Sequence, residues 1–168
     1  MCRPLPGPAL ARPALCLVLA TSDPVEYDGT YPLPESQQDR FGFQIRIDYP
    51  SCADEMEIRR RCESGIELRD PSKAGVEPGL SGDDMGACRE QVAKVVIDEK
   101  IRKYVVDLAA ATRTAPEIAL GASTRAEVLL MLASRALAAF DGSDFVTPDH
   151  VKALLAPAFR HRLILRPE

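Results

Sequence analysis

Asp23 and Arg40 stand where a folded chain of this kind can contact a ligand. Asp23 closely follows the apolar run 14–20, and Arg40 follows a loop rich in turn-forming residues. In an open α/β sheet, ligands bind beside the carboxyl ends of the strands. At such a place Asp23 can orient a water or sense a phosphate, and Arg40 can contact an anion.

Arg125 is the third candidate, in the first turn of a helix that we expect to begin after Ser123. A cation is disfavoured at this end of a helix, where unpaired backbone N–H groups attract anions. The helical period places Arg125 on one stripe with the apolar positions 129, 132, 136 and 140. An arginine placed in this way is consistent with an anion-binding site.

Each of the three residues also has a purely structural explanation. Arg125 can extend to solvent or pair with a nearby acid, and Arg40 can form a surface ion pair with Asp39 or Glu35. Asp23 can cap the turn that follows it. These alternatives stay open on the residues alone.

Composition excludes several classes of protein. The chain has 168 residues, 46% of them hydrophobic and 27% charged, which is ordinary for one globular domain or slightly more. A net charge of -4 gives no general attraction to nucleic acid. The five cysteines form no CxxC pair and offer no zinc site, so we expect reduced thiols that mostly fill apolar space.

The N-terminal region does not resemble a targeting signal. Prolines break residues 1–13, and the apolar run 14–20 is seven residues long, too short to span a membrane. We therefore expect no membrane span and a cytoplasmic protein.

Hydrophobic periodicity predicts strands in the first part of the chain and helices in the second. The predicted strands cover 14–21 and 41–47, with a helical turn at 35–39 and a charged surface helix at 53–63. Glycines and prolines mark 64–84 as a loop or hinge. Three later helices are predicted with caps at Asp98, Ser123 and Thr147, and the last apolar stretch, 163–165, is expected to pair or pack locally.

Taken together, several of these segments resemble MoxR-type AAA+ ATPases. One block resembles the family's stretch from sensor 1 to the arginine finger, and a second, distant block resembles its helical lid. The first block comprises 20–24, 26–35 and 39–41; the second comprises 111–113, 120–126, 144–152 and 160–165.

The resemblance implies an α/β fold: the end of an AAA+ P-loop-type core, with strands and flanking helices, followed by an all-α lid bundle. The corresponding domains are an irregular segment at 1–13, a core remnant at 14–64, a linker at 65–84 and the lid at 85–168.

The resemblance also implies a role for each candidate residue. Asp23 takes the sensor 1 position, where the family usually has an asparagine that helps to position the attacking water. Arg40 matches the arginine finger, which reaches in trans the ATP of the neighbouring subunit. Arg125 matches sensor 2, which contacts the nucleotide phosphates. The implied cofactors are ATP and magnesium, and the implied activity is ATP hydrolysis coupled to chaperone-like remodelling or maturation of partner proteins.

The implied assembly is a hexameric AAA+ ring, with von Willebrand factor A-domain proteins as partners. This sequence departs from the family pattern in two respects. It contains no GxxxxGK[ST] phosphate loop (Walker A) and no acidic Walker B strand, so we expect a fragment that does not hydrolyse ATP alone. Asp23 offers only acceptors where asparagine offers a donor as well.

A second interpretation is a non-catalytic regulatory module that joins or blocks an AAA+ ring. A third is a truncated reading frame within a longer gene.

Overall fold

The computed structural model of this chain describes residues 17–22, 33–65, 76–77 and 79–167. Its contacts divide the chain into two compact units, Met1–Pro32 and Leu33–Glu168. Only residues 17–22 of the first unit are described, and all elements named below belong to the second unit.

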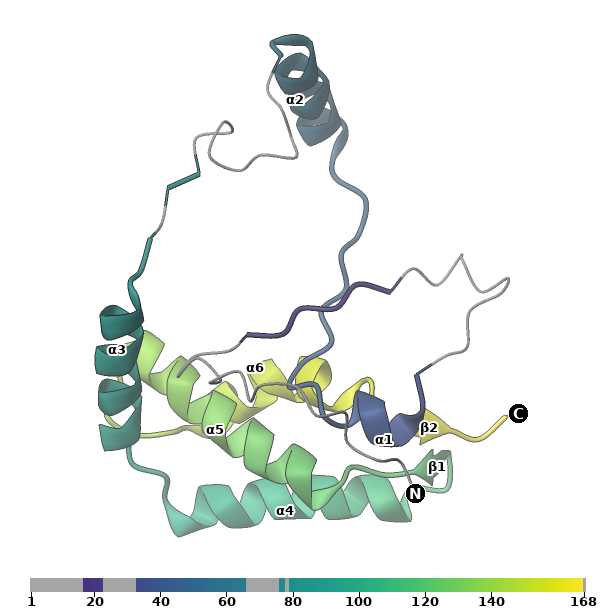
Figure 1. Ribbon diagram of the computed structural model, residues 1–168. Coiled ribbons are helices and arrows are strands. Elements are labelled where there is room, and N and C mark those ends of the chain that lie inside the picture. Colours follow the sequence, from purple (N-terminus) through teal and green to yellow (C-terminus); the bar gives the residue numbers. More distant parts are fainter. Residues whose placement is uncertain (1–16, 23–32, 66–75, 78, 168) are drawn as a thin grey trace, which may run out of the picture. The chain divides into compact units, whose positions relative to one another are not determined.

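The described part of the second unit is mostly helical (Figure 1). Its elements, in chain order, are α1 (Glu35–Gln38), α2 (Cys52–Glu63), α3 (Gly82–Lys94), α4 (Glu99–Thr114), β1 (Ile118–Leu120), α5 (Thr124–Phe140), α6 (Pro148–Phe159) and β2 (Ile164–Leu165). None of these helices combines the length and the apolar character needed to cross a lipid bilayer.

The three predicted helix starts are confirmed. The side chains of Asp98, Ser123 and Thr147 each accept a hydrogen bond from a backbone N–H in the first turn of α4, α5 and α6, respectively. Such caps satisfy N–H groups that have no partner within the helix. At the other end of α5, Gly142 adopts a positive φ of 70° just beyond the last turn.

The hydrophobic core of the described residues lies among α4, α5, α6 and the loops beside them. Its fully buried side chains include Val105 from α4, Leu130 from α5 and Val151 from α6. These three helices contact one another pairwise. The helical bundle predicted for this part of the chain is therefore confirmed.

Two short backbone pairings join segments that lie outside the helices of the bundle. β1 and β2 pair antiparallel, with Ile118 opposite Leu165, so of the two outcomes expected for the last apolar stretch, pairing or local packing, the structure shows pairing. The loop before α4 pairs with the loop before α6 through a parallel bridge between Val96 and Phe145.

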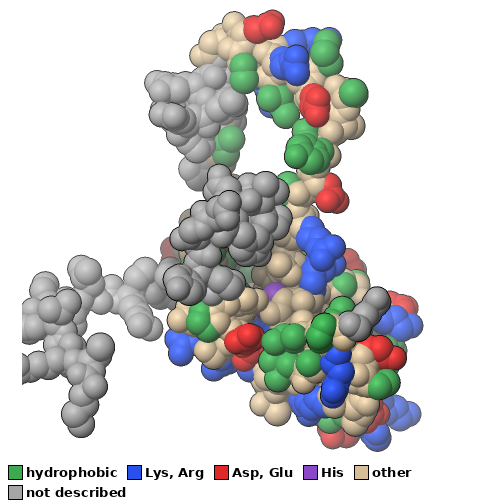
Figure 2. Space-filling model, turned by 90° about the vertical axis from the view of Figure 1, so that its right-hand side faces the viewer, with side chains coloured by type: hydrophobic (Ala, Val, Ile, Leu, Met, Phe, Trp, Pro, Cys, Tyr) green, Lys and Arg blue, Asp and Glu red, His purple; other side chains and the backbone are tan. Residues whose placement is uncertain are grey.

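α2 has no buried residue, as expected for a charged surface helix. Figure 2 shows basic, acidic and hydrophobic side chains next to one another on its surface. α3 also has no buried residue, although it contacts α5. Three cysteines on these two helices, Cys52, Cys62 and Cys88, are exposed free thiols, so the expectation that the cysteines fill apolar space is wrong for them.

Neither predicted strand is present in the described residues. Residues 17–22 and 41–50 have no regular secondary structure, and side chains such as Leu19 and Ile47 are exposed. The physical reason is that a strand needs a neighbour for its backbone N–H and C=O groups. The described chain offers these segments no partner strand, and within residues 43–50 the backbone forms one hydrogen bond in the described structure, from the Gln44 N–H to the Pro157 carbonyl at 2.9 Å.

Candidate functional site

Arg40 follows the single helical turn of α1 and points its side chain into solvent. The backbone N–H of Arg40 bonds to the Gln37 carbonyl, and that of Phe41 bonds to the Gln38 carbonyl at 3.0 Å. Pro34 begins this turn without a side-chain cap. Arg40 is exposed, and across the described residues no hydrogen bond or ion pair engages its guanidinium.

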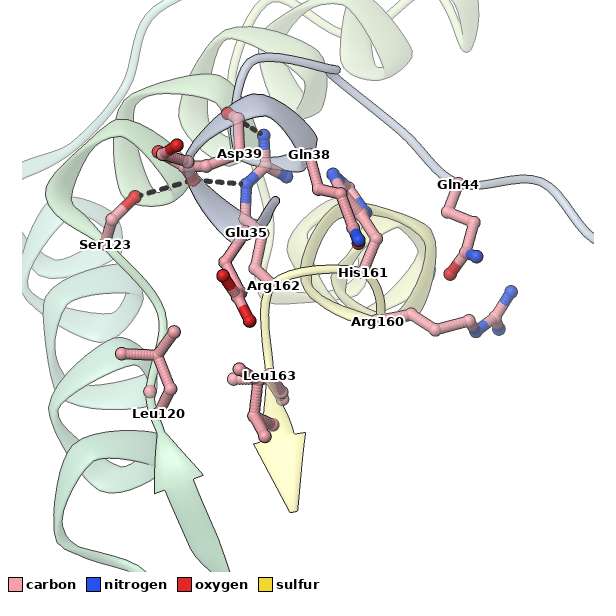
Figure 3. Close-up of a pocket in the computed structure, with 13 residues that line it drawn as sticks. Glu35, Gln38, Asp39, Gln44, Leu120, Ser123, Arg160, His161, Arg162 and Leu163 are labelled. Atoms are coloured by element: carbon pink, nitrogen blue, oxygen red, sulfur yellow. Dashed lines mark hydrogen bonds and ion pairs between the residues drawn. The ribbon is translucent and has the colours of Figure 1, made fainter. Parts of the chain in front are cut away.

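Asp39 is the centre of a polar cluster that joins α1 to the helical bundle (Figure 3). Its Oδ1 accepts hydrogen bonds from Ser123 Oγ and from Arg162 Nε, both at 2.9 Å. Its Oδ2 lies 3.4 Å from Arg125 Nη1. The alternative in which Arg40 forms a surface ion pair with Asp39 is therefore wrong, because Asp39 is engaged by residues more than 80 positions away.

The cluster places a carboxylate at the N-terminus of α5. Ser123 accepts a hydrogen bond from the Ala126 N–H at 3.3 Å and donates its own hydrogen to Asp39. The helix dipole favours negative charge at this end. The carboxylate beside this helix start belongs to Asp39, and its contact with Arg125 is the pairing with a nearby acid that the residues alone left open as the structural alternative.

Arg162 is the most deeply buried charged group of the cluster, with 2% of its side chain exposed. It lies between the end of α6 and segment 39–42. Besides Asp39 Oδ1, its guanidinium donates to four backbone carbonyls, those of Asp39, Phe41, Gly42 and Ala158. A buried cation is tolerated only when it is paired and hydrogen-bonded, and Arg162 meets both conditions.

His161 lies beside this cluster and contacts the same segment. Its Nε2 is 3.1 Å from the Phe41 carbonyl oxygen, while its Nδ1 is buried without a partner in the described structure. Burial lowers the pKa of His161 below its ordinary value, and the positive charge of Arg162 acts in the same direction. His161 and Arg162 both line a hollow of about 590 Å³, together with Gln38, Gln44 and Leu163 (Figure 3).

A second hollow, of about 490 Å³, brings the two predicted arginines together. It is lined by Arg40 from the turn after α1 and by Thr124, Arg125, Val128 and Leu129 from α5. Arg125 keeps 55% of its side chain exposed despite its contact with Asp39. Two cationic side chains, one without a partner in the described chain and one only loosely paired, therefore face one surface depression.

The predicted apolar stripe of α5 is not its buried face. The buried positions are 126, 127, 130, 134 and 138, whereas Leu132 and Phe140 are 53% and 93% exposed. The expectation that Arg125 lies on a core-facing stripe is thus wrong. Arg125 nevertheless lies in the first turn of α5, as predicted, and it lines one hollow together with Arg40.

Comparison with known proteins shows which family this chain belongs to. Residues 7–43 match the ATPase family associated with various cellular activities (AAA), and residues 110–168 match the AAA lid domain. Chaperone MoxR1 of Mycobacterium tuberculosis is 35% identical over 168 residues, covering 95% of this chain and 43% of the relative. The uncharacterised protein YeaC of Bacillus subtilis is 37% identical over 151 residues, covering 90% and 46%, respectively. The chain belongs to the MoxR family of AAA+ ATPases.

A solved structure agrees with this assignment. The crystal structure of a candidate ATPase from Cytophaga hutchinsonii is similar with a TM-score of 0.75 and 36% identity, over 88% of this chain and 46% of that chain. The fold class expected from the sequence, the end of an α/β AAA+ core followed by a helical lid, is confirmed. The chain spans about half the length of the relatives it matches.

The residues of the polar cluster come from both segments of the chain that match family models. Asp39 and Arg40 lie in the segment that matches the AAA family, whereas Ser123, Arg125 and Arg162 lie in the segment that matches the lid. The cluster therefore connects the segment around Arg40, which matches the AAA family, to the segment that matches the lid. Asp23, which the resemblance predicts at the sensor 1 position, lies outside the described residues.

The sequence did not single out Arg162 or assign Asp39 its partners. One local signal was available for Arg162: a basic residue directly before the apolar stretch 163–165. That signal does not reveal burial, because the acceptor on Asp39 is 123 residues away.

Proposed function

We propose that this chain supplies the arginine finger Arg40 and the sensor 2 residue Arg125 to the ATP site of an AAA+ ring. The observation that carries the proposal is the shared hollow in which these two arginines meet. Two guanidinium groups that line one surface depression raise the positive potential there, so binding of an anion is favoured. A phosphate group has oxygen acceptors that suit the planar donor set of arginine.

Arg40 and Arg125 would act on the charge that develops during phosphoryl transfer. In such reactions the protein contributes mainly positioning and electrostatic stabilisation, and an arginine from a neighbouring subunit contributes a large part of the rate. Arg40 suits this role because it is exposed and carries no competing partner in the described part of the chain. Arg125 suits it because its contact with Asp39 is long, at 3.4 Å, and solvent-exposed.

The described residues of this chain suit the phosphate part of ATP and include no set of ligands for its magnesium ion. The described residues contain no group of three or more histidines, cysteines or carboxylates that could hold a metal. The sequence also contains no GxxxxGK[ST] loop. We therefore assign Mg²⁺ no ligand from the described residues, and the missing phosphate loop leads us to expect no ATP hydrolysis by this chain alone.

The family suggests the wider setting of this chemistry. One relative is named a chaperone, which supports ATP-driven remodelling or maturation of partner proteins as the activity of the whole assembly. A ring, hexameric as in related AAA+ proteins, would provide the neighbouring site that Arg40 needs. Partners with von Willebrand factor A domains and a cytoplasmic location stay proposals, the latter supported by three exposed free thiols. Asp23 stays proposed as a degenerate sensor 1.

The test is complementation in trans. Chaperone MoxR1, with its own finger arginine changed to alanine, is mixed with increasing amounts of this chain, and ATP hydrolysis is followed. We expect the wild-type chain to raise the rate and the Arg40→Ala chain to bind without raising it. An equal effect of both chains would overturn the proposal.

The same experiment addresses the regulatory alternative. If the chain binds intact MoxR1 and lowers its rate, and Arg40→Ala does the same, the chain acts as a module that blocks ring function rather than as a donor of the finger.

A further inference from the structure

We propose that Arg162 is a positioning residue that holds the arginine-finger segment 39–42 on the lid and thereby directs Arg40. The inference rests on the proposed function of Arg40 and adds a residue that acts through it. Three features of the structure support it: the hydrogen bonds of Arg162, its burial and the backbone that surrounds it.

The guanidinium of Arg162 uses all of its hydrogen-bond donors. An arginine side chain has five N–H groups in a rigid fork. In this structure Nε donates to Asp39 Oδ1 at 2.9 Å, and Nη1 donates to the carbonyls of Gly42, at 3.2 Å, and Ala158. Nη2 donates to the carbonyls of Asp39, at 3.1 Å, and Phe41, at 2.5 Å. Five donors thus meet five acceptors.

Four of the five acceptors lie immediately on either side of Arg40. They belong to Asp39, Phe41 and Gly42, and the carbonyl of Arg40 itself is not among them. The guanidinium therefore fixes the backbone before and after Arg40 and leaves the Arg40 side chain free to reach outward.

Segment 39–42 has little else to determine its conformation. α1 ends at Gln38, and residues 41–50 belong to no helix or strand. Three local turn bonds, from the N–H groups of Asp39, Arg40 and Phe41, and the bond from the Gln44 N–H to the Pro157 carbonyl are the backbone–backbone hydrogen bonds of this stretch in the described structure. Long-range contacts from the lid must therefore supply its order, and Arg162 supplies most of them at one point.

The fifth acceptor attaches the segment to the lid. Ala158 is in the last turn of α6, where carbonyls lack partners within the helix. By bonding Ala158 and segment 39–42 with one rigid group, Arg162 makes the finger move with the end of α6. A change in lid position then becomes a change in the position of Arg40.

The test compares Arg162→Lys with Arg162→Gln and with the matched control Arg160→Lys. Lysine keeps the charge but has three donors without the planar fork, so it cannot replace five bonds. Arg160 is a neighbouring, partly exposed arginine whose side chain forms no hydrogen bond or ion pair with segment 39–42 in the described structure. The first readout is hydrogen exchange of the Gln44 amide relative to helical amides such as Leu130. The second is complementation of the finger-deficient MoxR1 ring.

We expect Arg162→Lys and Arg162→Gln to speed Gln44 exchange by about tenfold while Leu130 stays protected. We also expect both to lower the stimulated rate at saturation by about tenfold, with unchanged half-saturating chain concentration, because ring binding is not altered. Arg160→Lys should resemble wild type in both readouts.

Two results would overturn the inference: unchanged Gln44 exchange in Arg162→Lys, or wild-type stimulation by Arg162→Lys when Arg40→Ala is inactive. If Arg40→Ala stimulates as well as wild type, the proposed function fails, and the exchange experiment still decides whether Arg162 positions the segment. If neither Arg162 variant folds, Asp39→Asn replaces them, because it takes the negative charge from the one carboxylate that Arg162 contacts and leaves Arg162 itself in place. Unchanged Gln44 exchange in Asp39→Asn would then count against the inference.

Discussion

Arg113 Nη2 lies 2.5 Å from Glu127 Oε1, and this pair joins the end of α4 to the first turns of α5. The same guanidinium donates from Nε to the Ala122 carbonyl at 2.8 Å, and Thr112 Oγ1 accepts from the Ala122 N–H at 2.9 Å. Both polar groups of the Ala122 backbone are therefore held by α4. Ser123 follows directly, so these contacts determine where α5 and its Arg125 begin.

The first prediction concerns this pair. Glu127 has 11% of its side chain exposed, so Arg113→Ala leaves a nearly buried carboxylate without its cation. We expect a loss of about 2 kcal/mol in the free energy of unfolding, below the full cost of breaking a buried pair because Arg113 is 41% exposed. Urea denaturation measures the difference.

Arg102→Ala is the matched control for Arg113→Ala. Arg102 pairs with Glu99 on the same helix at 2.8 Å, with 49% and 84% of the two side chains exposed. A pair of this kind contributes about 0.5 kcal/mol or less. Equal losses in the two variants would show that the Arg113–Glu127 contact has no special role.

The second prediction concerns Gly121, which packs closely against Arg113. A Cβ at this position would stand 2.7 Å from Arg113 Cγ and 2.8 Å from its Cα. Because the second atom is backbone, it cannot move without shifting the end of α4. We expect Gly121→Ala to cost about 1 to 3 kcal/mol and to lower the melting temperature.

Gly86→Ala provides the opposite control. Gly86 lies inside α3, and a methyl group added there would meet no other atom within 4 Å among those outside its own helix backbone. Alanine should therefore stabilise the helix by about 0.5 to 1 kcal/mol. If Gly121→Ala were as well tolerated as Gly86→Ala, the close approach to Arg113 would not exist in solution.

Local sequence signals predicted the helices of the lid well. Each helix start is specified by a capping residue next to it: Asp98, Ser123 or Thr147. The apolar spacing that predicts each helix lies in the same short stretch of sequence. The strands predicted at 14–21, from an apolar run, and at 41–47, from alternation, are absent from residues 17–21 and 41–47, because neither pattern can supply a neighbouring strand. The prediction of the apolar stripe of α5 was wrong because this helix carries apolar residues on several sides, and the sequence alone does not show which side is buried.

The candidate site was predictable only in part. The motif around Arg125 and the sequence around Arg40 carried enough information to single out both residues, and the structure brings them to one hollow. The Asp39–Arg162 contact was not predictable, because it joins residues 123 positions apart and no local pattern records it. The role of Asp23 stays a prediction, since that residue lies outside the described structure.

The third prediction is a pH dependence that originates at His161. Burial lowers the pKa of His161 in the folded chain, Arg162 lowers it further, and the Phe41 carbonyl and Asp39 oppose the shift. Unfolding restores the ordinary pKa of about 6.5, so the unfolded chain binds more protons in this range. Stability from this residue is therefore complete above about pH 6.5 and is lost as the pH falls through the folded pKa.

Substitution of His161 by glutamine tests this dependence. We expect the unfolding free energy of wild type to fall more steeply than that of His161→Gln between about pH 7.5 and 5.5. Urea denaturation at several pH values gives both curves, and titrations elsewhere in the chain cancel in their difference. Parallel curves would contradict the assignment.

The fourth prediction separates stability from function at Arg125. Its contact with Asp39 is 3.4 Å long and its side chain is 55% exposed, whereas Ser123 and Arg162 hold Asp39 at 2.9 Å. Arg125→Ala should therefore change the free energy of unfolding by about 0.5 kcal/mol or less, since exposed ion pairs contribute little. The same variant should lose most of its ability to stimulate the finger-deficient MoxR1 ring, because it removes one of the two cations at the hollow. Urea denaturation and the complementation assay, run on one preparation, give both quantities. A variant that is clearly destabilised yet stimulates normally would make Arg125 a structural partner of Asp39 and not a contact for nucleotide.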